Sequence, residues 1–296
     1  MSIFGLGGNA SIEIILDNIA SRKSVTIKEK DDTTINLPLY KGEDDISGRV
    51  EVNIGKSKKL EHMGIRIELI GRIESYADSK QSSDFVSMGK ELLSAGCLTE
   101  DTSFKFSFNN FEKQYETYNG LGVKLRYFIR VTINRQYAPN IVKEKDFAVH
   151  VQGIEPKLIR DIKMEVGIEG CLHIEFEYNK KAFHQTDCII GQVFFRLIDM
   201  KIVKMDLELV KKELYGTDPE GPSQESSIAQ FEVMDGCPSR GEIIPIRLYL
   251  KTFNLTPTFT NVNNRFSVMY FLNLVLVDET NRRYFKRQEI IIWRKK

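Results

Sequence analysis

The stretch Val-Lys-Leu-Arg-Tyr-Phe-Ile-Arg-Val-Thr-Ile, residues 123–133, alternates apolar side chains with mostly polar ones. Such alternation is typical of a β-strand that buries one face. A shift of 143 residues brings the same phase back as Phe-Ser-Val-Met-Tyr-Phe-Leu-Asn-Leu-Val-Leu, residues 266–276. Phe128, which interrupts the polar face of the first copy, then falls on Phe271. This repetition predicts two copies of one β-domain.

Other parts of the chain repeat in the same order. The shift of 143 also relates residues 46–54 to residues 189–197, whereas residues 67–69 match residues 207–209 at a shift of 140. The difference indicates small compensating insertions between the copies. Alternation also predicts strands at residues 12–16, 65–73, 104–108, 172–178 and 284–293, and a hairpin over residues 24–39. Many short strands separated by turns favour an all-β sandwich.

The length of 296 residues suits two domains of about 150 residues each. We predict an N-terminal β-sandwich over residues 1–150 and a C-terminal one over residues 151–296, with a turn-rich boundary at residues 137–162. Polar or Gly- and Pro-rich composition predicts connections at residues 78–84, 216–227 and 234–241, and a turn at Asp31-Asp32-Thr33. Residues 85–98 fit either a strand or a short helix.

Charge and cysteine usage narrow the class of protein. The 42 basic and 41 acidic residues are interleaved, so no nucleic-acid partner is expected. The first eight residues lack the basic and long apolar regions of a signal peptide, and no apolar run is long enough to span a membrane. Four cysteines without paired spacing argue against a structural zinc site. We therefore expect a cytoplasmic protein with reduced thiols.

No motif in the sequence points to catalysis. There is no G-x-S-x-G, and the glycines at positions 5, 7 and 8 lack the Lys-Ser/Thr pair of a phosphate loop. We interpret His173 as a polar-face histidine rather than a ligand or the base of a pair with Cys171. We interpret Glu43-Asp44-Asp45 as an acidic turn rather than a calcium site. No catalytic residue, metal or cofactor is expected, and an enzyme would need residues distant in sequence to converge.

Several longer strings in both halves follow one another in an order typical of a known family. They lie at residues 60–62, 64–68, 125–128, 163–169, 171–178, 234–236, 244–247, 270–279, 282–286 and 293–295. Through them the chain closely resembles the vacuolar protein sorting-associated protein 26 family, the arrestin-fold subunit of retromer, from about residue 12 to residue 296. The resemblance implies an all-β, bilobed molecule of two arrestin-like β-sandwiches, immunoglobulin- or fibronectin-like, without enzymatic activity. The family also has a C-terminal tail, which would follow Lys296.

The same resemblance implies a function and partners. Members of the family belong to the retromer cargo-recognition complex and bind its α-solenoid subunit, vacuolar protein sorting protein 35. With sorting nexins they retrieve transmembrane cargo from endosomes to the Golgi or the plasma membrane by its cytoplasmic tails. We therefore expect a cytoplasmic protein that sits peripherally on endosomal membranes, with indirect membrane contact.

The resemblance places the solenoid-binding site at the connection that starts near residue 233. Its residues would be Val233, Met234, Asp235, Gly236, Pro238 and Gly241. A few apolar anchors beside a Gly- and Pro-rich loop can dominate an interface. A core position in a strand is an equally good interpretation of Val233.

A groove for cargo, shared with a phox-domain sorting nexin, would contain Val166 and Phe285. In the family an extended cargo tail adds to a sheet edge there and places one bulky apolar residue in a pocket. Ordinary core positions are the alternative for both residues. Lys41 stands where some relatives carry an acidic residue for a PDZ-containing nexin, so the resemblance does not extend to that contact.

Another class of adaptor stays open at this point, namely an arrestin-like adaptor for phosphorylated receptors or for ubiquitin ligases. Ligase adaptors commonly carry Pro-rich motifs that end in Pro-x-Tyr, and the eight prolines form no Pro-rich motif. A phosphate sensor needs a convergent basic groove. The evenly mixed charges do not reveal one, although folding could assemble it.

Overall fold

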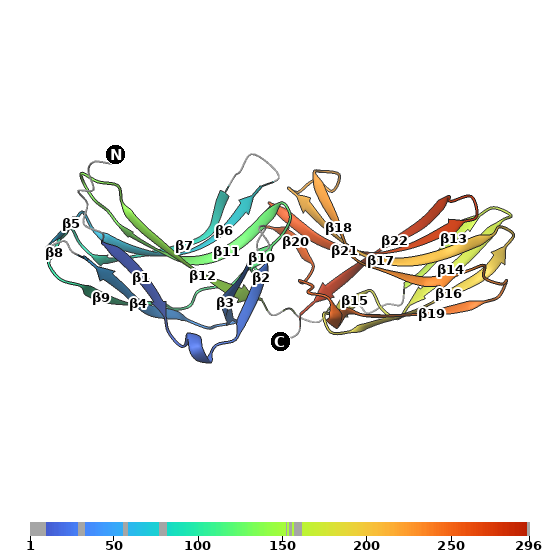
Figure 1. Ribbon diagram of the computed structural model, residues 1–296, viewed down its shortest axis with the longest axis horizontal. Coiled ribbons are helices and arrows are strands. Elements are labelled where there is room, and N and C mark those ends of the chain that lie inside the picture. The colour runs from blue at the N-terminus through green and yellow to red at the C-terminus, as the bar shows by residue number, and fades with distance from the viewer. Residues whose placement is uncertain are drawn as a thin grey trace, which may run out of the picture. The chain divides into compact units, whose positions relative to one another are not determined.

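The computed structural model describes residues 10–28, 33–55, 59–76, 82–151, 153, 156 and 162–294. The chain divides into two compact units, residues 1–151 and 152–296, which are both built from strands (Figure 1). Across these described ranges there is no α-helix, and the only helical turns are two 3-10 turns, Ile19–Ser21 and Leu250–Thr252. The prediction of an all-β chain with two arrestin-like β-sandwiches is confirmed.

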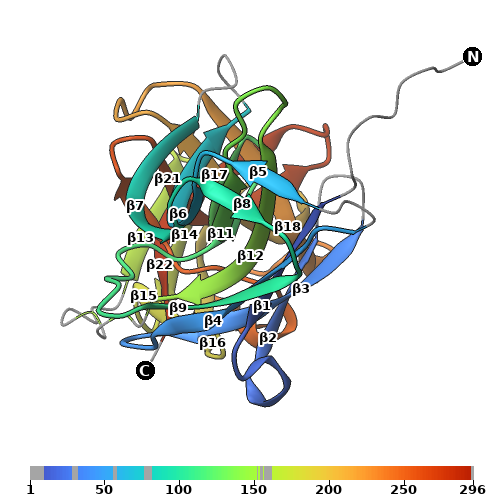
Figure 2. The same cartoon turned by 90° about the vertical axis from the view of Figure 1, so that its left-hand side faces the viewer.

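The first unit consists of two layers, which Figure 2 shows with β1, β4 and β9 in one layer and β6, β11 and β12 in the other. The smaller sheet has the order β1-β4-β9, and the larger has the order β2-β3-β12-β11-β6-β7 with β10 paired to β11. A short ribbon pairs β5 with β8. The strands are β1 (Ser11–Leu16), β2 (Ser24–Lys28), β3 (Thr34–Lys41), β4 (Ile46–Asn53), β5 (Leu60–His62), β6 (Ile65–Ser75), β7 (Ser82–Leu93), β8 (Gly96–Leu98), β9 (Thr102–Phe108), β10 (Tyr118–Asn119), β11 (Val123–Ile133) and β12 (Ile141–His150).

The second unit is a sandwich of the same kind. One sheet has the order β13-β14-β16-β19, and the other has the order β15-β22-β21-β17-β18 with β20 paired to β21. The strands are β13 (Ile162–Ile168), β14 (Leu172–Tyr178), β15 (Ala182–His184), β16 (Cys188–Ile198), β17 (Ile202–Tyr215), β18 (Ser223–Asp235), β19 (Ile243–Tyr249), β20 (Phe259–Val262), β21 (Phe266–Asp278) and β22 (Arg283–Trp293).

Most strands of the two units correspond, as the periodicity predicts. In the first unit Leu69 pairs with Ile129, and in the second Leu209 pairs with Leu272. These partners are related by the predicted shifts of 140 and 143 residues. Even the parallel pair recurs, since β3 runs beside β12 and β15 runs beside β22. Among the described strands, β13 has no counterpart in the first unit, and β2, β5 and β8 have none in the second.

A pair of glycines fixes the closest approach of neighbouring strands in both units. Gly48 and Gly191 occupy the same place in the repeat, on β4 and β16. A Cβ atom at Gly48 would lie 2.2 Å from the carbonyl oxygen of Ile15, and one at Gly191 would lie 2.5 Å from that of Glu177. Neither distance is compatible with a side chain, because real Cβ atoms do not approach backbone oxygens so closely. Both positions therefore require glycine.

Arginine side chains cover the aromatic residue that interrupts the polar face of β11. Phe128 has no exposed surface although it lies on the outer side of the sheet. Three guanidinium carbons lie over its ring, at distances from the ring centroid of 4.2 Å for Arg126, 5.2 Å for Arg130 and 5.5 Å for Arg72. The repeat position Phe271 is covered in the same way by Arg287, at 3.8 Å. Cation–π contact explains why both copies keep this aromatic residue.

Some predicted boundaries are wrong because edge strands are polar. Residues 85–98, ambiguous in sequence, are β7 and β8 rather than a helix, and β7 already begins at Ser82, inside the predicted connection 78–84. Likewise β18 begins at Ser223, inside the predicted connection 216–227, and continues to Asp235, inside the predicted connection 234–241. Both β7 and β18 are edge strands and none of their residues is fully buried, so both tolerate the polar composition that looks like a connection in the sequence.

Three smaller expectations concern short motifs. The glycines at positions 5, 7 and 8, and two residues of the turn predicted at residues 31–33, lie outside the described residues. Pro38-Leu39-Tyr40 does have Pro-x-Tyr spacing, but it lies within β3 and Tyr40 is only 1% exposed. The triplet is therefore not available to a ligase.

Two further expectations concern the state of the cysteines and membrane-spanning helices. All four cysteines are free: Cys97, Cys171 and Cys237 are exposed and Cys188 is half-buried. Over the part of the chain that the structure describes, no helix has the length and hydrophobicity to cross a bilayer.

An aspartate closes the same turn in both units. Asp187 accepts a hydrogen bond from the His184 backbone N–H at 2.9 Å and forms an ion pair with Lys180. At the equivalent place in the first unit, Asp44 accepts a hydrogen bond from the Lys41 backbone N–H at 2.9 Å. Although partial burial opposes it, these contacts lower the pKa of Asp187. A lowered carboxyl pKa stabilises the fold above that pKa, and this contribution disappears as the pH falls.

Replacing Asp187 by Asn should therefore cost about 1 kcal/mol of unfolding free energy at pH 7. The difference from the unmodified protein should shrink as the pH drops below the ordinary carboxyl range, because both chains then lack the charge. Urea unfolding at pH 7 and at acid pH measures both quantities. An equal loss at every pH would contradict the role of the charge.

Candidate functional site

The predicted solenoid-binding residues lie where β18 ends and its connection to β19 begins. The strand β18 is the outer strand of its sheet and pairs only with β17 (Figure 1). Its pairing is interrupted by a bulge, because Met234 lies opposite Met205 and Glu232 lies opposite Asp206. Val233 is the extra residue between them. A bulge at an edge re-aims side chains, and here both Val233 and Met234 are half-buried.

The connection after Met234 is held in a defined shape. Gly236, at φ 107°, donates its N–H to the Val203 carbonyl at 2.9 Å, and Gly241, at φ 84°, donates to Phe195 at 2.6 Å. Both φ values lie in the region that only glycine adopts easily. Pro238 is buried, whereas Asp235, Gly236 and Gly241 are exposed. The structure thus brings all six predicted residues together in one anchored turn.

One residue of this surface is missing from the sequence-based prediction. Phe231 is 39% exposed and lies on β18, two residues before Val233. Its ring meets that of Phe253, with 6.0 Å between centroids. In the sequence, Phe231 stands out only as an apolar residue in a polar stretch. The bulge at Val233 shifts the alternation of side chains, so the sequence does not show which face Phe231 lies on.

The two residues of the predicted cargo groove lie on different sheets of the second unit. Val166 is half-buried on β13, an edge strand that pairs only with β14. Phe285 is 74% exposed on β22. The strand β22 meets β15 only at residues 291–293, so its stretch 283–290 has no partner on that side among the described strands. Phe285 is therefore a surface residue rather than a core residue, and both positions border unpaired strand edges.

Lys41 is the last residue of β3 and is half-buried at the start of the turn that Asp44 closes. Arg22 pairs with Asp44 at 2.8 Å, and the Lys113 ammonium donates to the carbonyls of Gly42 and Asp44 at 2.9 and 2.7 Å. Basic neighbours thus hold the acidic turn predicted at residues 43–45 against the rest of the unit through an ion pair and hydrogen bonds.

A cavity in the first unit contains none of the predicted residues. Its volume is about 670 Å³, and His62, Met63, Arg135 and Tyr137 are among its lining residues. His62 is 4% exposed, neither ring nitrogen has a hydrogen-bond partner, and burial lowers its pKa. Because the repeat places buried Ile202 at the equivalent position, the fold itself does not require a histidine there.

Comparison with known proteins gives a consistent result over the whole chain. The family model described as Vacuolar protein sorting-associated protein 26 matches residues 6–281. A protein of that name from Dictyostelium discoideum is 48% identical over 290 residues, which cover 98% of this chain and 83% of the relative. Vacuolar protein sorting-associated protein 26B from Mus musculus is 47% identical over 296 residues, covering 100% and 88%. The Caenorhabditis elegans protein is 48% identical over 294 residues, covering 99% and 82%.

Proposed function

Since this chain belongs to the vacuolar protein sorting-associated protein 26 family, we propose that it is a non-catalytic subunit of the retromer cargo-recognition complex. In this proposal it binds the α-solenoid subunit through the turn after β18. With sorting nexins it captures the cytoplasmic tails of transmembrane cargo on endosomes. The observation that carries the proposal is the similarity to members of this family over nearly all of both sandwiches.

The anchored turn after β18 supports the docking role. Hydrogen bonds from Gly236 and Gly241 fix its backbone before any partner arrives. A preorganised turn loses less conformational entropy on binding than a mobile one. Met234 and Phe231 offer apolar surface beside it, which suits the apolar anchors of a helical partner.

The proposal is tested by copurification. The tagged chain, expressed in a eukaryotic cell, should retain the solenoid subunit at near-equal amounts after gel filtration. Failure to retain it, with the chain folded by circular dichroism, would contradict the proposal.

The unpaired edges of β13 and β22 support the cargo role. An extended peptide can add to an unpaired edge by backbone hydrogen bonds, while one pocket selects a side chain. Such an edge would let Phe285 contact the bulky residue of the tail.

Replacing Phe285 by Glu should weaken binding of a cargo-tail peptide to the complex with a sorting nexin at least tenfold. The fold should be unaffected, because the side chain is 74% exposed. Tyr249→Glu is the matched control, since Tyr249 is 60% exposed on β19. Calorimetry with the assembled complex measures both, and an equal effect of the two changes would contradict the assignment.

The alternative of a phosphate-sensing adaptor receives less support. The arginines gathered on the outer face of the first unit are matched by carboxylates. Arg126 pairs with Asp146 at 2.6 Å, Arg130 pairs with Glu144 at 2.7 Å, and Arg72 pairs with Asp84 at 2.5 Å. A phosphate would have to displace these partners.

A further inference from the structure

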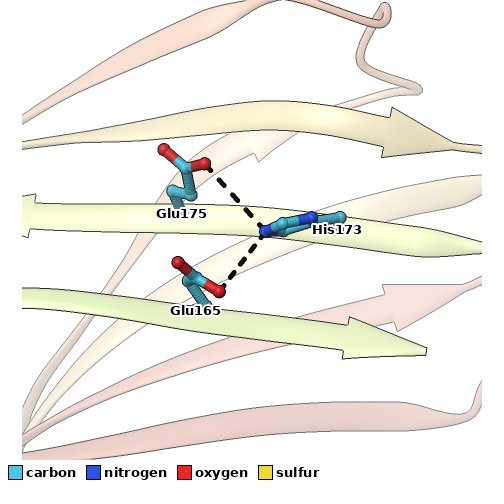
Figure 3. A group of neighbouring side chains, drawn as sticks. All are labelled: Glu165, His173 and Glu175. Atoms are coloured by element: carbon cyan, nitrogen blue, oxygen red, sulfur yellow. Dashed lines mark ion pairs between the residues drawn. The ribbon is translucent and has the colours of Figure 1, made fainter. Parts of the chain in front are cut away.

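Three side chains that can bind a metal ion converge on the outer face of β13 and β14 (Figure 3). Glu165 lies directly across from Glu175, and His173 lies two residues before Glu175 on the same face. The His173 Nε2 atom is 3.7 Å from Glu165 Oε2 and 4.0 Å from Glu175 Oε1. We propose that Glu165, His173 and Glu175 form a zinc-binding site.

The charges around the cluster favour a cation. Like charges directly opposite on neighbouring strands destabilise a sheet, and Glu165 and Glu175 form such a pair. Arg196 compensates Glu175 at 2.9 Å, and Lys163 lies 2.7 Å from Glu177. A divalent cation between the two carboxylates would turn the repulsion into attraction.

The ligand atoms are close to the geometry that zinc requires. Zinc binds imidazole nitrogen and carboxylate oxygen at about 2.0–2.2 Å, so ligand atoms in a tetrahedral site lie about 3.4 Å apart. The three ligand atoms here all lie within 4.8 Å of one another. Glu165 is 72% exposed along its side chain and can rotate to close the difference.

The imidazole nitrogen that faces the carboxylates has no other role. His173 Nε2 is shielded from solvent and makes no hydrogen bond, although the ring is 44% exposed. At 3.7 and 4.0 Å the two carboxylates are too far away to hydrogen-bond this shielded nitrogen, and a metal ion between the three ligand atoms would satisfy it. The Arg196 contact would hold the Glu175 carboxylate in place, as outer contacts commonly do for metal ligands.

Room for the remaining ligand is present beside the cluster. Three protein ligands leave a fourth tetrahedral position for water. Glu165 and His173 line a cavity of about 260 Å³ together with Gly167 and Glu169. Gly167 lies directly across from His173 and has no side chain to fill this space.

The site depends on a strand that only the second unit has. The strand β1 of the first unit corresponds to β14, and Ser11 and Glu13 stand at the positions of His173 and Glu175. No described strand borders β1 on its outer side, so the first unit has no equivalent of Glu165. The sandwich therefore forms without this cluster, and zinc would link an edge strand to its neighbour.

The test uses the purified full chain and zinc chloride in isothermal titration calorimetry. One zinc ion should bind per chain, and excess magnesium should not displace it, because imidazole favours zinc. His173→Gln and Glu165→Gln should each weaken binding at least tenfold. Glu177→Gln, on the same face of β14 but outside the cluster, should leave binding unchanged.

Cobalt gives a second measurement on the same variants. Cobalt(II) in place of zinc should give visible absorption bands that His173→Gln removes, with circular dichroism showing that the variant is folded. Binding that survives His173→Gln, a loss shared by Glu177→Gln, displacement by magnesium, or no binding at all would each overturn the proposal.

Discussion

Replacing Met234 by Asp is expected to reduce the affinity for the α-solenoid subunit thirtyfold or more. Met234 follows the bulge at the end of β18, and the adjacent turn is already anchored. An unpaired carboxylate pressed into an apolar pocket of the partner costs about 2–5 kcal/mol. Calorimetric titration of the two purified proteins measures the change.

The control for this change lies on the same strand. Ile228 is also a half-buried extra residue at a bulge of β18, between Ser227 and Ala229, and lies away from the turn. Ile228→Asp should therefore leave the affinity within about threefold. Two outcomes would refute the contact at Met234. One is an equal loss of affinity in both variants, and the other is a loss of unfolding free energy in Met234→Asp as large as its loss of binding free energy.

The second large effect concerns stability. Gly48→Ala should destabilise the first unit by about 3 kcal/mol, because the added Cβ would lie 2.2 Å from a backbone oxygen that cannot move without breaking the sheet. For a unit of this size that loss lowers the melting temperature by about 10 °C. Gly191→Ala should act in the same way on the second unit.

Calorimetry of the two variants and of one control tests this expectation. Gly96 has its nearest non-neighbouring atom 3.9 Å from an added Cβ, so Gly96→Ala should leave the melting temperature nearly unchanged or raise it slightly. A melting temperature for Gly48→Ala equal to that of the control would show that the strands can separate locally at no cost.

Much of the fold was predictable from the alternation of side chains. The shift between residues 123–133 and 266–276 predicts which strands correspond, and the registers of Leu69 and Leu209 agree with it. The edge strands β7 and β18 were misjudged because their exposed faces carry polar residues that look like connections. Pairing with a neighbour, which a single sequence does not display, decides their extent.

The candidate sites were predictable to different degrees. The resemblance to the family located the turn around Met234 and the residues Val166 and Phe285, but not their exposure. The bulge at Val233 depends on the register between two strands, so no local pattern could reveal it. Glu165 and His173 likewise come together only through the pairing of β13 with β14. In the sequence His173 by itself looks like an ordinary solvated residue.

The two shifts of the repeat have a practical consequence for labelling the protein. The change from 143 to 140 falls in the segment between β4 and β6, and the change back falls between β9 and β11, while the paired strands keep their partners. Length has therefore already varied at these two places without disturbing either sandwich. A short peptide tag or a fluorophore attachment site inserted at exposed residues of these segments, such as Asn109 and Asn110 of the first unit, should therefore be tolerated. Both proposed docking surfaces belong to the second unit.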